Sequence, residues 1–147
     1  MRRAIGIFAL LAGFLLSIPF ALAQNEYEVS FGNYTVNYNS FPSTVLDANV
    51  AKAVGVKRSD SRGVMTIAIR YKAEGQVAKP VKADITATAT NLIGQLRKLD
   101  FKEVKEDGVF YYIGDFPVAR NETLTFDVSL IPDGETQRHE FKFTRKF

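Results

Sequence analysis

The residue types that enzymes use for nucleophilic and metal chemistry are scarce in this chain. It has no cysteine and a single histidine, His139. A chain without cysteine has no thiolate nucleophile, and one histidine cannot build a multi-histidine metal site. If His139 lies in a strand, it shares the face of the apolar side chain Phe141, and no Gly-x-Ser-x-Gly motif supplies a reactive serine. We therefore expect a protein that is not an enzyme and that carries no metal or other cofactor.

Carboxylates offer a weaker route to chemistry. Four acidic residues surround an expected hairpin, where a hard cation could bind, but two lysines are interspersed among them, which is typical of a solvated surface. These residues are Asp100, Lys102, Glu103, Lys105, Glu106 and Asp107. Glycoside hydrolysis needs two carboxylates at a set separation in a cleft, and the sequence does not place such a pair. A hydrolase with an unrecognised carboxylate site is therefore the last of our three hypotheses about function.

Two groups of side chains are better suited to binding than to reaction. Arg58 and Arg62 lie in a polar loop, and an arginine can hold a carboxylate or phosphate through two parallel hydrogen bonds. The alternative for this loop is a solvated connection after a helix. Tyr34, Tyr38 and Tyr112 could form an aromatic patch, and the alternative for them is packing in the core or under a loop.

The elements that must position these side chains are strands, because apolar and polar residues alternate along most of the chain. Asp107-Gly108 marks a hairpin, and Asp47 and Gly55 are suited to begin and end one short helix over 48–54. The pattern predicts an all-β fold, an antiparallel β-sandwich of about seven to eight strands that is Ig-like in architecture only; a small barrel is the alternative. The expected strands cover residues 27–31, 34–39, 64–71, 81–90, 99–105, 109–113, 124–130 and 141–144.

The first 23 residues have the layout of a secretory signal peptide. Arg2 and Arg3 precede a long uncharged run, and Ala21-Leu22-Ala23 forms a small-x-small cleavage box. We expect cleavage after Ala23, followed by a single domain over 24–147, export to the periplasm and no stable membrane insertion. An uncleaved membrane anchor is the alternative, because the uncharged run is close to the length that spans a bilayer.

Charge excludes one class of partner. Without Arg2 and Arg3 the chain carries 17 basic and 16 acidic residues, so it is almost neutral. Nucleic-acid binding depends on clustered positive charge, and we expect no nucleic-acid partner.

Several segments together carry a resemblance to a known family. They are Phe31–Tyr34, Tyr38-Asn39, Ser43-Thr44, Gly55–Ser59, Ala89–Gln95, Tyr111–Ile113 and Asp115–Val118. In these segments the chain resembles the DUF4426 family of exported bacterial proteins of unknown function, over nearly all of 27–147. The resemblance implies a periplasmic protein of Gram-negative bacteria and no particular activity. It adds Asn91 and Gln95 to the binding candidates, although turn geometry also explains Asn91.

The leading interpretation is therefore a non-catalytic periplasmic binding or accessory module that contacts another protein. A β-sandwich that binds a small ligand or glycan is the second.

Overall fold

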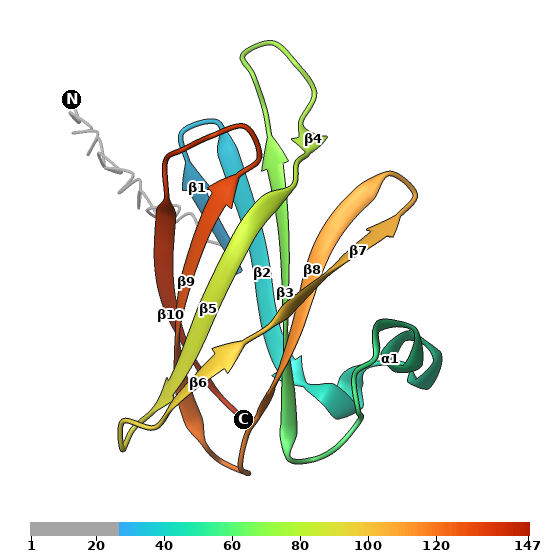
Figure 1. Cartoon of the computed structure of the whole chain (residues 1–147), viewed down its shortest axis with the longest axis vertical. Coiled ribbons are helices and arrows are strands. Elements are labelled where there is room, and N and C mark those ends of the chain that lie inside the picture. Colours follow the sequence, from blue (N-terminus) through green and yellow to red (C-terminus); the bar gives the residue numbers. More distant parts are fainter. Residues whose placement is uncertain (1–26) are drawn as a thin grey trace, which may run out of the picture.

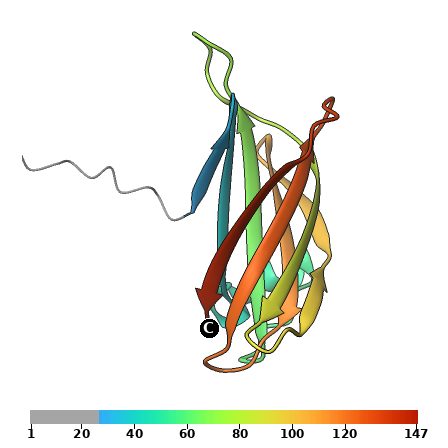
Figure 2. The same cartoon turned by 90° about the vertical axis from the view of Figure 1, so that its left-hand side faces the viewer.

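The computed structural model describes residues 27–147, so the expected signal peptide lies outside the described residues. Two antiparallel sheets pack face to face, which confirms the predicted β-sandwich (Figures 1 and 2). The larger sheet has the order β1-β2-β3-β8-β7, with β4 paired to β3, and the smaller has the order β10-β9-β5-β6. The larger sheet contains β1 (Glu28–Phe31), β2 (Tyr34–Pro42), β3 (Arg62–Tyr71), β4 (Lys79–Pro80), β7 (Phe101–Glu106) and β8 (Val109–Pro117). The smaller sheet contains β5 (Ala83–Asn91), β6 (Leu96–Leu99), β9 (Thr123–Pro132) and β10 (His139–Lys146).

The core lies between the two sheets, where the alternating apolar residues of both point inward. Phe116 of β8 and Phe126 of β9 are fully buried, with ring centroids 5.1 Å apart in an edge-to-face arrangement. Phe143 stacks on Phe126 at 4.8 Å, and Phe147 packs edge-on against Phe116 at 5.4 Å. This aromatic cluster joins the sheets near the end where the chain terminates.

The ten strands among the described residues exceed the seven to eight that we predicted, for two reasons. The two-residue β4 is too short to show any alternation. The predicted strand 99–105 corresponds to β7 of the larger sheet, whereas β6 of the smaller sheet, which ends at Leu99, was not predicted. The chain crosses from the smaller sheet to the larger one between Leu99 and Phe101. Gly114 lies opposite this crossing, where an added Cβ would come within 3.1 Å of the Asp100 carbonyl oxygen.

The short helix and the hairpin are where the sequence predicts them. Helix α1 (Ala48–Val54) begins after Asp47, whose Oδ1 accepts hydrogen bonds from the backbone N–H groups of Asn49 (2.8 Å) and Val50 (3.3 Å). It ends at Gly55, which is left-handed with φ of 72°. A short 3₁₀ turn, η1 (Ser43–Val45), connects β2 to α1. Within residues 27–147, no helix has the length and apolar character that spanning a membrane requires.

Candidate functional site

The two candidate arginines are engaged within the chain. Arg58 donates from Nη2 to the carbonyl oxygen of Thr44 at 2.9 Å. Arg62, at the start of β3, forms an ion pair with Asp115 and donates from Nε to its carboxylate at 2.7 Å. Both guanidinium groups therefore hold the 57–62 loop against neighbouring elements.

Two of the candidate tyrosines pack between the sheets. The ring of Tyr38 lies 4.8 Å from that of Phe141 and 4.7 Å from that of Phe143. Tyr112 is buried, and its hydroxyl accepts a hydrogen bond from the Ala83 N–H at 2.9 Å and donates to Glu103 at 3.3 Å. Burial is the main reason that the pKa of Tyr112 is raised. Both tyrosines therefore fit the alternative of core packing and do not form an exposed aromatic patch.

Replacing Tyr112 by phenylalanine should lower the free energy of unfolding by about 1–2 kcal/mol. The ring stays in the core, but the partly buried Ala83 N–H loses its acceptor. Chemical denaturation measures the loss, with Tyr71→Phe as control because the exposed Tyr71 hydroxyl accepts a long hydrogen bond from Asn33 at 3.5 Å. Equal stability of wild type and Tyr112→Phe would show that this hydrogen bond does not tie the sheets together.

The turn between β1 and β2 lies at the end of the sandwich opposite the β5–β6 turn (Figure 1), and the third candidate tyrosine, Tyr34, directly follows it. Tyr34 opens β2 and donates from its hydroxyl to Glu135 in the β9–β10 loop at 3.0 Å. Burial and the neighbouring carboxylate raise the pKa of Tyr34. It lines an open recess of about 530 Å³ together with Tyr71 and His139.

Asn91 and Gln95 are the candidates that the structure brings together, in the turn between β5 and β6. The Asn91 side-chain oxygen accepts hydrogen bonds from the N–H groups of Ile93 (3.2 Å) and Gln95 (2.8 Å). Its amide donates to the side chains of Gln95 (2.8 Å) and Glu122 (3.0 Å). Gly94 supplies the left-handed backbone, with φ of 82°. One side chain thus fixes the shape of the whole turn.

A largely buried ion pair between Arg97 and Glu122 supports this turn. Arg97 Nη2 lies 2.7 Å from Glu122 Oε1, and their side chains are 19% and 13% exposed. Glu122 also accepts from the Ala119 N–H at 2.8 Å, which anchors the β8–β9 loop to the same site. The Arg97 hydrogen bond is the largest cause that lowers the Glu122 pKa from 4.5 to about 2. The turn, β6 and the β8–β9 loop are therefore held as one unit.

This rigid turn presents bare aliphatic side chains to the surroundings. Leu92 is 84% exposed, Ile93 79% and Leu96 62%. We call these three residues the apolar tip. Leu92 and Ile93 lie in the turn itself, and Leu96 is the first residue of β6. Exposed apolar side chains are common singly, whereas a group of them is less usual on a protein surface. The sequence analysis missed them, although two aliphatic residues between Asn91 and Gly94 in a turn were a usable indication.

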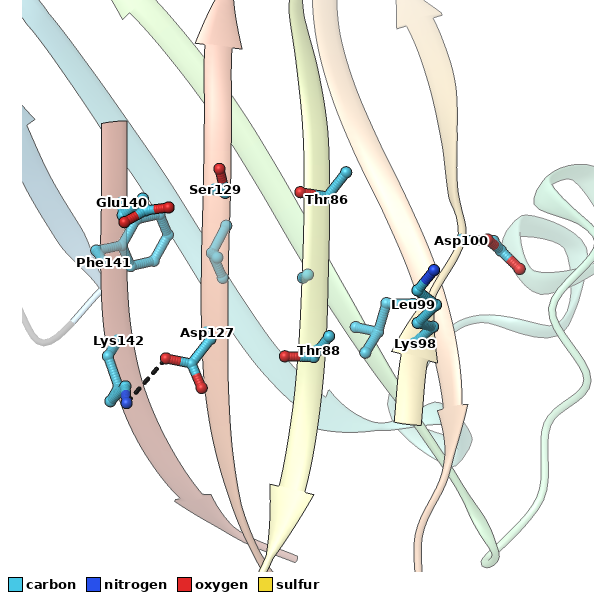
Figure 3. Close-up of a pocket in the computed structure, with 12 residues that line it drawn as sticks. Thr86, Thr88, Lys98, Leu99, Asp100, Asp127, Ser129, Glu140, Phe141 and Lys142 are labelled. Carbon is cyan, nitrogen blue, oxygen red and sulfur yellow. Dashed lines mark ion pairs between the residues drawn. The ribbon is translucent and has the colours of Figure 1, made fainter. Parts of the chain in front are cut away.

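A separate concavity lies on the outward-facing side of the smaller sheet (Figure 3). It measures about 780 Å³, and its charged side chains include Asp127 and Lys142, which pair at 2.9 Å. Thr86, Thr88 and Ser129 add hydroxyl groups. None of the seven candidate residues lines it. Across residues 27–147, no three histidine, aspartate or glutamate side chains come together in a way that could hold a metal ion.

Comparison with known proteins places the chain in a family. The model of DUF4426, a domain of unknown function, matches residues 28–147. A crystal structure of a DUF4426 family protein from Pseudomonas aeruginosa PAO1 is similar, with 35% identity, a TM-score of 0.69, and coverage of 82% of this chain and 92% of that chain. FetP from uropathogenic E. coli strain F11 has the same fold, with 12% identity, a TM-score of 0.53, and coverage of 82% and 90%. No curated protein matches the chain. The chain belongs to the DUF4426 family.

Proposed function

We propose that the protein is a non-catalytic binding module of the periplasm that docks its apolar tip into an apolar groove of a partner protein. The observation that carries the proposal is the combination of exposure and bracing at one turn. Leu92 and Ile93 are almost fully exposed, while the Asn91 side chain makes four hydrogen bonds, two of them to the backbone N–H groups of Ile93 and Gln95. A surface that is ordered before binding loses less conformational entropy when it docks.

Bracing favours a protein over a membrane as the occupant. A protein groove has a fixed shape, so a turn of fixed shape fits it better than a flexible one. A fluid bilayer adapts to any inserted residue and rewards no particular turn geometry. The apolar tip also has no tryptophan or tyrosine, the residues that anchor proteins at membrane interfaces.

The charged residues next to the apolar tip indicate which charges should surround the groove of the partner protein. Arg97, Lys98 and Arg120 are the cations of β6 and the β8–β9 loop, and Glu122 is the acid between them. Because Arg97 is paired with Glu122, Lys98 and Arg120 remain as exposed positive charges. We infer a groove with an acidic rim, which would steer the partner toward the tip.

The periplasmic location rests on the signal peptide expected over residues 1–23. Intact mass of the exported protein should correspond to a chain that begins at Gln24. A mass that begins at Met1 would contradict export with cleavage.

The proposal is tested by placing a photo-crosslinking amino acid at position 93 in living cells. Val77 is the matched control, because it is 84% exposed and lies in the loop between β3 and β4, away from the tip (Figure 1). We expect one reproducible protein adduct from position 93 and none of the same mass from position 77. The same adduct from both positions, or adducts with lipid alone, would overturn the proposal.

A further inference from the structure

We propose a second binding site, for a small alkylammonium cation, in the recess at the opposite end of the sandwich from the apolar tip. The recess measures about 530 Å³, which is within the range of small-molecule sites. It is independent of the tip, so either proposal can fail without the other.

Three aromatic residues that line this recess are brought together by the register of the larger sheet. Phe31 of β1 is the register partner of Tyr34 of β2, and Tyr34 is the partner of Tyr71 of β3. Partners in register point to the same face of a sheet, so the three rings form one row across the strand ends. The centroids of Tyr34 and Tyr71 lie 5.0 Å apart.

The other sheet closes the wall with an imidazole. His139, the first residue of β10, stacks on Phe31 with centroids 4.9 Å apart and lies 6.0 Å from Tyr34. Four rings from four strands therefore line one recess, and all four are partly buried. Aromatic faces attract cations within about 6 Å of the ring centre.

A single carboxylate gives the recess its charge. Glu135 in the β9–β10 loop lines the recess and accepts a hydrogen bond from the Tyr34 hydroxyl at Oε1, at 3.0 Å. The remaining lining residues are Gly32, Asn33 and Gln137, so no lysine or arginine among residues 27–147 lines the recess to neutralise that charge. A carboxylate beside aromatic faces favours an organic cation over an anion or a neutral ligand.

The test uses a property of the sequence. His139 is the only histidine, so its imidazole proton resonance is assigned without further work. The purified protein is titrated with choline and, separately, with 3,3-dimethylbutan-1-ol, which has nearly the same shape but no charge. We expect choline to shift the His139 resonance saturably and the neutral alcohol to bind at least about tenfold more weakly.

Two variants separate a site from general surface attraction. Glu135→Gln should weaken choline binding about fivefold or more, because it removes the one charge in the recess. Glu140→Gln is the control, since Glu140 lines the outer concavity of the smaller sheet instead. Neither side chain is buried, so we expect both variants to fold.

Three results would overturn the assignment. They are no saturable shift with choline, equal binding of choline and the neutral alcohol, and equal weakening by the two variants. A saturable shift with glucose but not with choline would instead identify a saccharide site and would equally contradict the proposal.

Discussion

Replacing Glu122 by glutamine is expected to lower the free energy of unfolding by about 3 kcal/mol at pH 7. The substitution leaves Arg97, whose side chain is 19% exposed, without its counter-charge. Arg97 already has one buried nitrogen, Nη1, with no hydrogen-bond partner among the described residues. Breaking a largely buried ion pair by removing one partner typically costs several kcal/mol.

The pH dependence of this loss distinguishes it from a simple packing defect. Folding lowers the Glu122 pKa from 4.5 to about 2, so the unfolded chain binds the proton more tightly. The stabilisation is therefore complete above about pH 5 and is lost as pH falls from 4.5 toward 2. Near pH 2 the protonated carboxyl is as neutral as the glutamine amide, and the two proteins should approach equal stability.

Urea denaturation of wild type and Glu122→Gln at about pH 7, 4 and 2.5 measures this difference. Asp127→Asn is the control, because Asp127 pairs with Lys142 while both side chains are half exposed, and its loss should change stability by under about 1 kcal/mol. A difference between wild type and Glu122→Gln that stays constant over this range would contradict the account of the ion pair.

Replacing Phe126 by alanine should have the largest effect on the fold, about 3–5 kcal/mol. Its ring is fully buried and contacts the rings of Phe116, Phe143 and Phe147. Removing it opens a cavity that rigid strands cannot close. Phe126→Leu keeps most of the volume and should cost about 1–2 kcal/mol. Equal losses for the two variants, measured by chemical denaturation, would show that filling the cavity is not what stabilises the core.

The fold was predictable because alternation reports which side chains point inward. It indicated the strands, and the capping chemistry of Asp47 and Gly55 indicated the helix. Alternation does not report when a strand changes sheets, so the crossing at Asp100 was missed.

The candidate residues were harder to predict, because their partners lie far away in the sequence. Arg62 meets Asp115, 53 positions later, and Tyr34 meets Glu135, 101 positions later. The residue type indicates what a side chain can bind. Only the fold decides whether another residue of the same chain already binds that side chain. Asn91 and Gln95 could be foreseen as a pair, because a turn brings residues four apart together.

The central claim is that the apolar tip is the contact surface. It is tested most directly by replacing residues of the tip with aspartate. The double variant Leu92→Asp/Ile93→Asp is compared with Val77→Asp, with the crosslinking amino acid at position 95 in both. All three replaced side chains are at least 79% exposed, so both variants should melt within a few degrees of wild type.

We expect the partner adduct from position 95 to persist in Val77→Asp and to fall at least about thirtyfold in the double variant, since burying two aliphatic side chains supplies several kcal/mol. An adduct of undiminished intensity in a folded Leu92→Asp/Ile93→Asp protein would show that the tip does not bind the partner.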